Sequence, residues 1–339
     1  MSKIHNHQLT AILFLSGAWS VICIPSLYGN GQMTGTAFAC LLQILLCLPM
    51  LALHSGTFTN QIQKHKLLGI LYILFFLICG ANGFAQLWEA APPQLLPSSG
   101  KLTAAVLIAL TCFYTSSAGL RATARAAPIV MGLFIISLLV LILGAWKRAD
   151  LSRISFQTEN FLPSIKTYFS LSGELAAVWI LTDHIRNHHK FSAVNFYLIA
   201  KALFCIFILF FSISAGGRLI HLNGYPFFTL TALSQPLQGQ RADALYILVF
   251  VMLHIMHTTL QTGIVEHIAE QMYPIAEKWS APVSLIFMLI PAYFFKSDML
   301  ENIIFWSLPV FIFFIPLYLR IRQFFRSIQK KEQTHYEMS

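Results

Sequence analysis

Charged side chains are scarce in this sequence. Asp, Glu, Lys and Arg make up 10% of the 339 residues, whereas hydrophobic residues make up 57% and the mean hydropathy is +0.68. A water-soluble domain carries about a quarter charged residues, and a disordered chain needs low hydrophobicity. The scarcity of charge therefore excludes both classes and indicates a polytopic membrane protein within a lipid bilayer.

Chemical motifs are also missing. The sequence contains no Walker-type glycine loop for ATP, no GxSxG and no HExxH, so we expect neither an enzyme nor a bound cofactor or metal. Its six cysteines lie in apolar runs without a CxxC pair, which is typical of packing residues. The net charge of +9 comes from basic residues spread between apolar runs, a pattern of membrane topology rather than of nucleic-acid binding.

Long apolar runs dominate what remains, and a membrane-crossing helix needs about 20 such residues. We predict ten spans in an all-α single transmembrane domain covering 1–339: 9–27, 34–53, 67–88, 102–119, 126–146, 161–183, 192–216, 243–269, 281–296 and 301–320. The distribution of Lys and Arg favours cytoplasmic termini and a basic cytoplasmic tail over 321–339, although the basic cluster at 147–153 opposes this orientation.

Two spans are interrupted by small and polar residues. Ser16, Gly17 and Ser20 cluster in the first span, and Ser172, Gly173 and Glu174 interrupt the sixth. If 9–146 and 161–320 form two halves of five helices, these positions are equivalent, which predicts a 5+5 inverted repeat with helices 1 and 6 broken. The alternative is that the small residues only allow close helix packing.

Glu174 is the most informative polar residue, because a carboxyl within the bilayer costs a few kcal/mol. Lys201, inside the seventh span, either pairs with Glu174 or Asp183 or extends to the cytoplasmic surface. His254 and His257 share one face of the eighth span, where cavity lining, interhelical hydrogen bonds or a proton relay are open alternatives. We interpret the His-rich run 183–190 as a solvated loop.

Four landmarks in sequence order resemble one known family. They are Ile4 with Gln8-Leu9 before the first span, Pro25-Ser26 after its small residues, Gly173-Glu174 in the sixth span, and Gly224-Tyr225-Pro226-Phe227 followed by Gln240-Arg241-Ala242-Asp243. This order resembles that of the spore germination permeases, the membrane B-subunits of germinant receptors, within the amino acid–polyamine–organocation superfamily. The chain departs from the superfamily's Gly-x-Gly in the first span, where it has Ala18-Trp19-Ser20.

The resemblance implies a LeuT-like fold with a central pocket for a small nutrient, such as an amino acid, in the inner membrane of the spore. It also implies two partners, a membrane subunit with a cytoplasmic domain and a lipoprotein. The expected ligand-binding residues are Gly17, Ala18, Ser20, Ser172, Gly173, Glu174, Phe84, Thr258, Thr259 and Thr262. The alternatives are a proton-coupled amino acid transporter with the same fold and a channel or scaffold without a ligand.

Overall fold

A computed structural model describes residues 4–25, 32–53, 65–90, 101–154, 160–183, 190–217, 225–234, 243–273, 279–323 and 325. The loop 184–189, the tail beyond Phe325, and the landmarks Ser26, Gly224 and 240–242 lie outside these residues. The described chain is helical, in this order: α1 Asn6–Ile22, α2 Gln32–Leu53, α4 Lys66–Ala90, α5 Lys101–Ser117, α6 Leu120–Ala145, α7 Phe161–Ser170, α8 Leu175–Thr182, α9 Lys190–Gly216, α10 Pro226–Leu233, α11 Asp243–Met272, α12 Ser280–Phe294 and α13 Ser297–Pro309.

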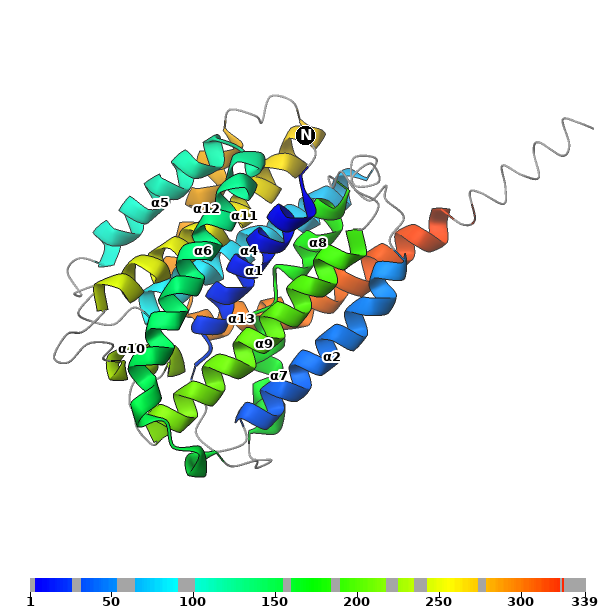
Figure 1. The fold of residues 1–339 in the computed structure, drawn as a ribbon. Coiled ribbons are helices and arrows are strands. Elements are labelled where there is room, and N and C mark those ends of the chain that lie inside the picture. The colour runs from blue at the N-terminus through cyan, green and yellow to red at the C-terminus, as the bar shows by residue number, and fades with distance from the viewer. Residues whose placement is uncertain are drawn as a thin grey trace, which may run out of the picture.

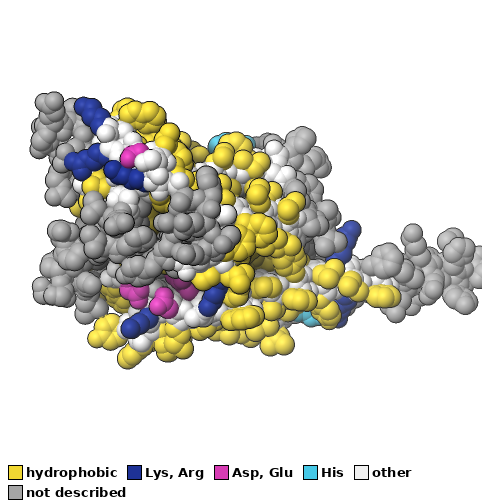
Figure 2. All heavy atoms as spheres, turned by 90° about the horizontal axis from the view of Figure 1, so that it is seen from below, with side chains coloured by type: hydrophobic (Ala, Val, Ile, Leu, Met, Phe, Trp, Pro, Cys, Tyr) yellow, Lys and Arg dark blue, Asp and Glu magenta, His cyan; other side chains and the backbone are white. Residues whose placement is uncertain are grey.

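These helices form an elongated bundle in which most helix axes run roughly along one direction (Figure 1). Within the described residues, five helices are long and apolar enough to cross a membrane: Lys66–Glu89, Leu120–Arg148, Ser192–Gly216, Leu245–Met272 and Ser297–Gln323. Large apolar side chains such as Leu45, Leu143 and Trp306 are more than 60% exposed. On the face drawn in Figure 2, charged side chains gather mainly toward the two ends, with hydrophobic ones between them. Such a surface fits a bilayer rather than water.

Helix α1 occupies the centre of the bundle. Every residue from Leu9 to Ile22 is buried, and the helix packs against α6, α9 and α11. The central place of α1 follows from this burial and these contacts, since an apolar helix in a bilayer can equally well face lipid. Helix α4 packs against α11, α12 and α13, and α2 packs against α7 and α9.

The sixth predicted span is interrupted as expected. It forms two short helices, α7 and α8, and residues 171–174 between them are not helical. The first predicted span is not broken at its small residues, and this expectation is wrong. Helix α1 continues through Ser16, Gly17 and Ser20 and ends at Ile22. The small residues there serve close packing, because they let neighbouring helices approach a continuous backbone.

Two local features were not expected. Helix α10 lies in what the sequence indicated as a loop. Pro226 is its first residue. Proline suits this position because it lacks an N–H group, and an N–H group there would have no partner within the helix. Within the last span, Pro309 is followed by a π-helical turn, Val310–Phe314. Proline disturbs the helical hydrogen-bond ladder, and such turns often mark functional sites. Tyr72 of α4 donates a 2.9 Å hydrogen bond to the Phe311 carbonyl in this turn.

One residue of the basic cluster at 147–153, Arg153, contacts the end of a helix. The Arg153 guanidinium donates 3.2 Å hydrogen bonds to the Ser214 and Ala215 carbonyls near the end of α9. Carbonyls at a helix C-terminus lack helical partners, and a cation stabilises them. Arg153 therefore has a structural role in capping α9.

Candidate functional site

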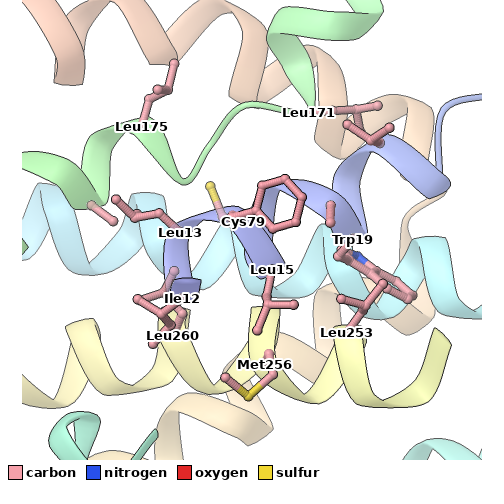
Figure 3. Close-up of a cluster of buried hydrophobic side chains, with 14 of the residues drawn as sticks. Ile12, Leu13, Leu15, Trp19, Cys79, Leu171, Leu175, Leu253, Met256 and Leu260 are labelled. Atoms are coloured by element: carbon pink, nitrogen blue, oxygen red, sulfur yellow. The ribbon is translucent and has the colours of Figure 1, made fainter. Parts of the chain in front are cut away.

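The break between α7 and α8 brings a carboxylate into the middle of the bundle. Helix α7 ends at Ser170, and α8 begins at Leu175 with Glu174 as its N-cap residue. The backbone turns tightly between them, since the Leu175 N–H donates to the Ser172 carbonyl at 3.0 Å. Figure 3 shows this turn beside α1, with Leu171 and Leu175 at its two ends and Cys79 close to it.

Glu174 and Lys201 form a buried ion pair at this break. The Lys201 ammonium lies 2.5 Å from Glu174 Oε1, and the two side chains are 1% and 0% exposed. Of the alternatives for Lys201, the structure therefore has the pairing with Glu174. Removing one partner from a buried pair leaves an uncompensated charge, so the two residues depend on each other.

Neutral hydrogen-bonding groups complete the surroundings of the pair. The Tyr197 hydroxyl donates to Glu174 Oε1 at 2.6 Å, and the Lys201 ammonium donates to Ser172 Oγ at 2.9 Å. Ser172 Oγ in turn donates to the Tyr168 carbonyl at 2.8 Å. The ammonium also lies 5.1 Å from the centre of the Tyr168 ring, within cation–π range. Glu174 Oε2 is buried without a hydrogen-bond partner among the described residues.

Helix α1 closes the site on one side, and Gly17 is the residue that lets it approach. A Cβ atom at Gly17 would lie 3.1 Å from Lys201 Cδ, 3.2 Å from Glu174 Oε1 and 3.4 Å from the Tyr197 ring. Any larger side chain would meet the ion pair. The helix contributes a close surface here, whereas its backbone N–H groups are engaged within the helix.

A second buried polar group lies on the α11 side of α1. Ser16 shares a 2.9 Å hydrogen bond with His257 Nδ1, and the ring of Trp19 lies 4.6 Å from that of His254. Phe84 of α4 contacts the same imidazole at a ring distance of 4.9 Å. Among the described residues, no group of three His, Cys, Asp or Glu could hold a metal ion. The two histidines make interhelical contacts to α1 and α4.

The predicted ligand residues divide between these surroundings. Gly17, Ser172 and Glu174 meet at the ion pair, and Gly173 packs beside it against Cys79. Ala18 and Ser20 are buried in α1, while Phe84 and Thr258 contact His254. The remaining two point elsewhere. Thr259 shares a 2.8 Å hydrogen bond with Thr115 of α5, and Thr262 Oγ1 lies 3.8 Å from Met288 Sδ of α12.

Sequence reasoning missed several residues near the break. Tyr168 and Tyr197 are tyrosines in apolar runs, and only the fold shows that the Tyr197 hydroxyl and the Tyr168 ring face the site. Glu301 was taken as the edge of the last span, yet Gln86 donates to its carboxylate at 3.2 Å and Ser170, the last residue of α7, at 3.5 Å. Asp298 lies three residues before Glu301, and two acids so close together are typical of a segment at the end of a membrane span.

Comparison with solved structures identifies the fold. The chain is similar to Mhp1, a nucleobase-cation-symport-1 family transporter solved in a closed conformation with bromovinylhydantoin bound. The TM-score is 0.57 at 17% sequence identity, and the match covers 89% of this chain and 75% of that one. The chain shares the overall fold of that transporter. No protein-family model and no curated protein matches the sequence. The likeness shows the fold, the five apolar helices of membrane-spanning length fit an integral membrane protein, and the ligand has to be argued from the site.

Proposed function

We propose that the protein binds and translocates a small zwitterionic solute of the amino acid type at the Glu174–Lys201 pair. The buried pair at the helix break is the observation that carries this proposal. Interrupted helices within a bundle are where transporters of this architecture bind their solutes. The solute would meet Glu174 with its ammonium group and Lys201 with its carboxylate.

The charge balance favours a zwitterion. The site contains one positive and one negative side chain, both fully buried. A solute with a single charge would neutralise one of them and leave the other unpaired, which is costly in a buried place. A zwitterion replaces both halves of the pair at once. In this proposal the solute carboxylate binds the Lys201 ammonium, because α1 is a continuous helix whose N–H groups around Gly17 are engaged within the helix.

Uptake by reconstituted protein tests the proposal. Proteoliposomes containing the full chain should accumulate labelled amino acids when a proton gradient is imposed, and Glu174→Gln should abolish uptake without loss of membrane insertion. Glu89→Gln is the matched control, because Glu89 lies at the end of α4 and its carboxylate accepts a hydrogen bond from the Ser297 N–H. Unchanged uptake by Glu174→Gln would refute the assignment.

The germinant-receptor role is the second candidate, and the four sequence landmarks are its only support. In it the same pocket senses an amino acid, and ligand binding shifts the helices toward a conformation that partner subunits read. The receptor is expected to reside in the inner membrane of the spore with both termini cytoplasmic. Copurification with a lipoprotein and a larger membrane subunit, together with ligand binding but no uptake, would favour it over the transporter.

A further inference from the structure

A buried histidine on the α11 side of α1 has no role in the proposed solute site. His257 of α11 shares a 2.9 Å hydrogen bond between its Nδ1 and the Ser16 hydroxyl of α1. Its Nε2 lies on the side of α4, where a Cβ at Gly83 would stand 3.2 Å from it. The ring is also hydrogen-bonded to the backbone of Cys79 in α4 and of Ser16. Both ring nitrogens therefore face oxygen atoms.

These contacts determine the tautomer of His257 and leave room for one more proton. A carbonyl only accepts hydrogen bonds, so the neutral imidazole carries its hydrogen on Nε2 and donates it to the Cys79 carbonyl. Nδ1 then accepts from the Ser16 hydroxyl. A proton that binds Nδ1 gives an imidazolium with two N–H donors, and the Ser16 hydroxyl can rotate to accept from the new one. His257 thus gains a proton without losing a hydrogen bond.

The second histidine of this helix face lacks such an arrangement. His254 Nε2 lies 3.4 Å from Thr258 Oγ1, whereas its Nδ1 is buried without a hydrogen-bond partner among the described residues. Burial opposes a charge on either imidazole unless hydrogen bonds and opposite charges offset the cost. Of the two, His257 is the one with acceptors for both N–H groups of its charged form.

Charged groups near the solute site also act on His257. Among the described residues, the titratable groups around it are His254 on its own helix, Cys79 on α4, Glu174 at the break and Lys201 on α9. Glu174 attracts a positive imidazole, and Lys201 repels it. A zwitterion bound at the pair adds no net charge there, so a proton on His257 would be the net charge that moves with the solute.

Helix α1 connects the two buried polar places, because it lies between the helix break and α11 (Figure 3). Gly17 lies so close to Glu174 that a single added carbon would stand 3.2 Å from the carboxylate oxygen. A solute that binds at the pair therefore needs α1 and the break to move apart. Ser16 precedes Gly17 in the same continuous helix, so a shift of α1 also changes the contact between Ser16 and His257.

We propose that His257 is the proton-binding site that couples solute movement to a proton gradient, with Ser16 and the Cys79 carbonyl stabilising its charged form. The inference rests on the proposed transport of an amino acid at Glu174 and Lys201. The proton binds the Nδ1 lone pair on the side of the membrane from which the solute enters. It leaves the same nitrogen on the other side, so His257 returns to its neutral form.

Reconstituted vesicles with a pH-sensitive dye inside test the assignment. A labelled mixture of neutral amino acids that enters through the wild-type chain should acidify the interior by about one proton per solute molecule. His257→Gln retains a donor and an acceptor but binds no proton. This variant should still be stabilised by amino acids and exchange them at equilibrium, because exchange needs no net proton movement. It should lose the acidification and the accumulation driven by a pH gradient.

His267→Gln is the matched control for this variant. His267 is another histidine of α11, and its ring contacts Gln271 near the end of the helix. This control should acidify the vesicles as the wild type does.

A second variant leaves the imidazole in place. Ser16→Ala removes the hydroxyl that accepts from the charged Nδ1, so about 3- to 10-fold more protons should be needed for half-maximal uptake. The pH profile of uptake therefore shifts to lower pH. Thr10→Ala is its control on the same helix, because the Thr10 hydroxyl donates to the Ala193 carbonyl of α9. It should leave the profile unchanged.

The outcomes separate this inference from the proposed function. Acidification that persists in His257→Gln, or an unchanged pH profile in Ser16→Ala, would refute the proton site and leave the solute site standing. Amino acid movement without protons in the wild type would have the same meaning. If His257→Gln folds but no longer binds amino acids, His257 belongs to the solute site and the inference is refuted. If the wild-type chain neither binds nor moves amino acids, the proposed function falls as well.

Discussion

Gly17 of α1 lies against Glu174 of the broken helix so closely that a single added carbon at Gly17 would stand 3.2 Å from the carboxylate oxygen. This contact explains why a helix without charge or a break of its own belongs to the site. It also makes the position sensitive to size rather than to polarity.

We expect Gly17→Leu to displace the ion pair and to lower the free energy of unfolding by about 1–3 kcal/mol, as overpacking does. Ligand binding should be lost together with stability. Gly132→Leu is the control, since a Cβ at Gly132 of α6 meets no atom within 4 Å. Thermal denaturation in detergent compares the two, and equal effects would contradict the close approach of α1.

Gly173 makes a still tighter contact on the other side of the break. A Cβ at this position would lie 2.6 Å from Cys79 Sγ of α4, a distance that Cβ atoms do not tolerate. We expect Gly173→Ala to destabilise the protein and to shift Glu174.

Removing the sulfur should restore space. The double variant Gly173→Ala/Cys79→Ala is therefore expected to be more stable than Gly173→Ala alone, with a coupling energy of about 0.5–3 kcal/mol between the two sites. Additive effects in this double-mutant cycle would show that the two residues do not touch.

Lys201 and Glu174 should be strongly coupled in stability. Lys201→Met leaves a buried carboxylate without its partner and is expected to cost about 3–5 kcal/mol in free energy of unfolding. Adding Glu174→Gln should recover much of that loss, because no charge then remains buried. Lys166→Met, at an exposed position of α7, should change stability by less than about 0.5 kcal/mol. A double variant that is worse than Lys201→Met alone would argue against the pair.

Two neighbouring threonines of α11 should differ in whether their substitution affects ligand binding or only stability. Thr259 bonds to Thr115 of α5, so Thr259→Val should cost about 1 kcal/mol of stability and leave ligand affinity unchanged. Thr258 Oγ1 lies 3.4 Å from His254 Nε2, on the side of α1. Thr258→Val should therefore lower ligand affinity more than it lowers stability. Binding and unfolding measurements on both variants test this. A larger loss of ligand affinity in Thr259→Val than in Thr258→Val would contradict the orientation of α11.

The helix break in the sixth span was predictable because its signal is local. Serine, glycine and glutamate in succession interrupt an apolar run, and a carboxyl within a bilayer needs a partner or a cavity. The same reasoning was wrong for α1. Serine and glycine there allow close packing as readily as they allow unwinding, and only the neighbours of α1 decide between the two.

The sequence by itself determined that this protein lies in a membrane, and approximately where its spans are. A chain with 10% charged residues and long apolar runs does not form a water-soluble fold. It also identified Glu174, because an acid in an apolar span is expensive wherever the span lies. The tertiary structure decided which cation pairs with Glu174. Lys201 is 27 residues away on another helix, and its choice between Glu174 and the membrane surface depends on the packing of α1, α8 and α9, which no local pattern encodes.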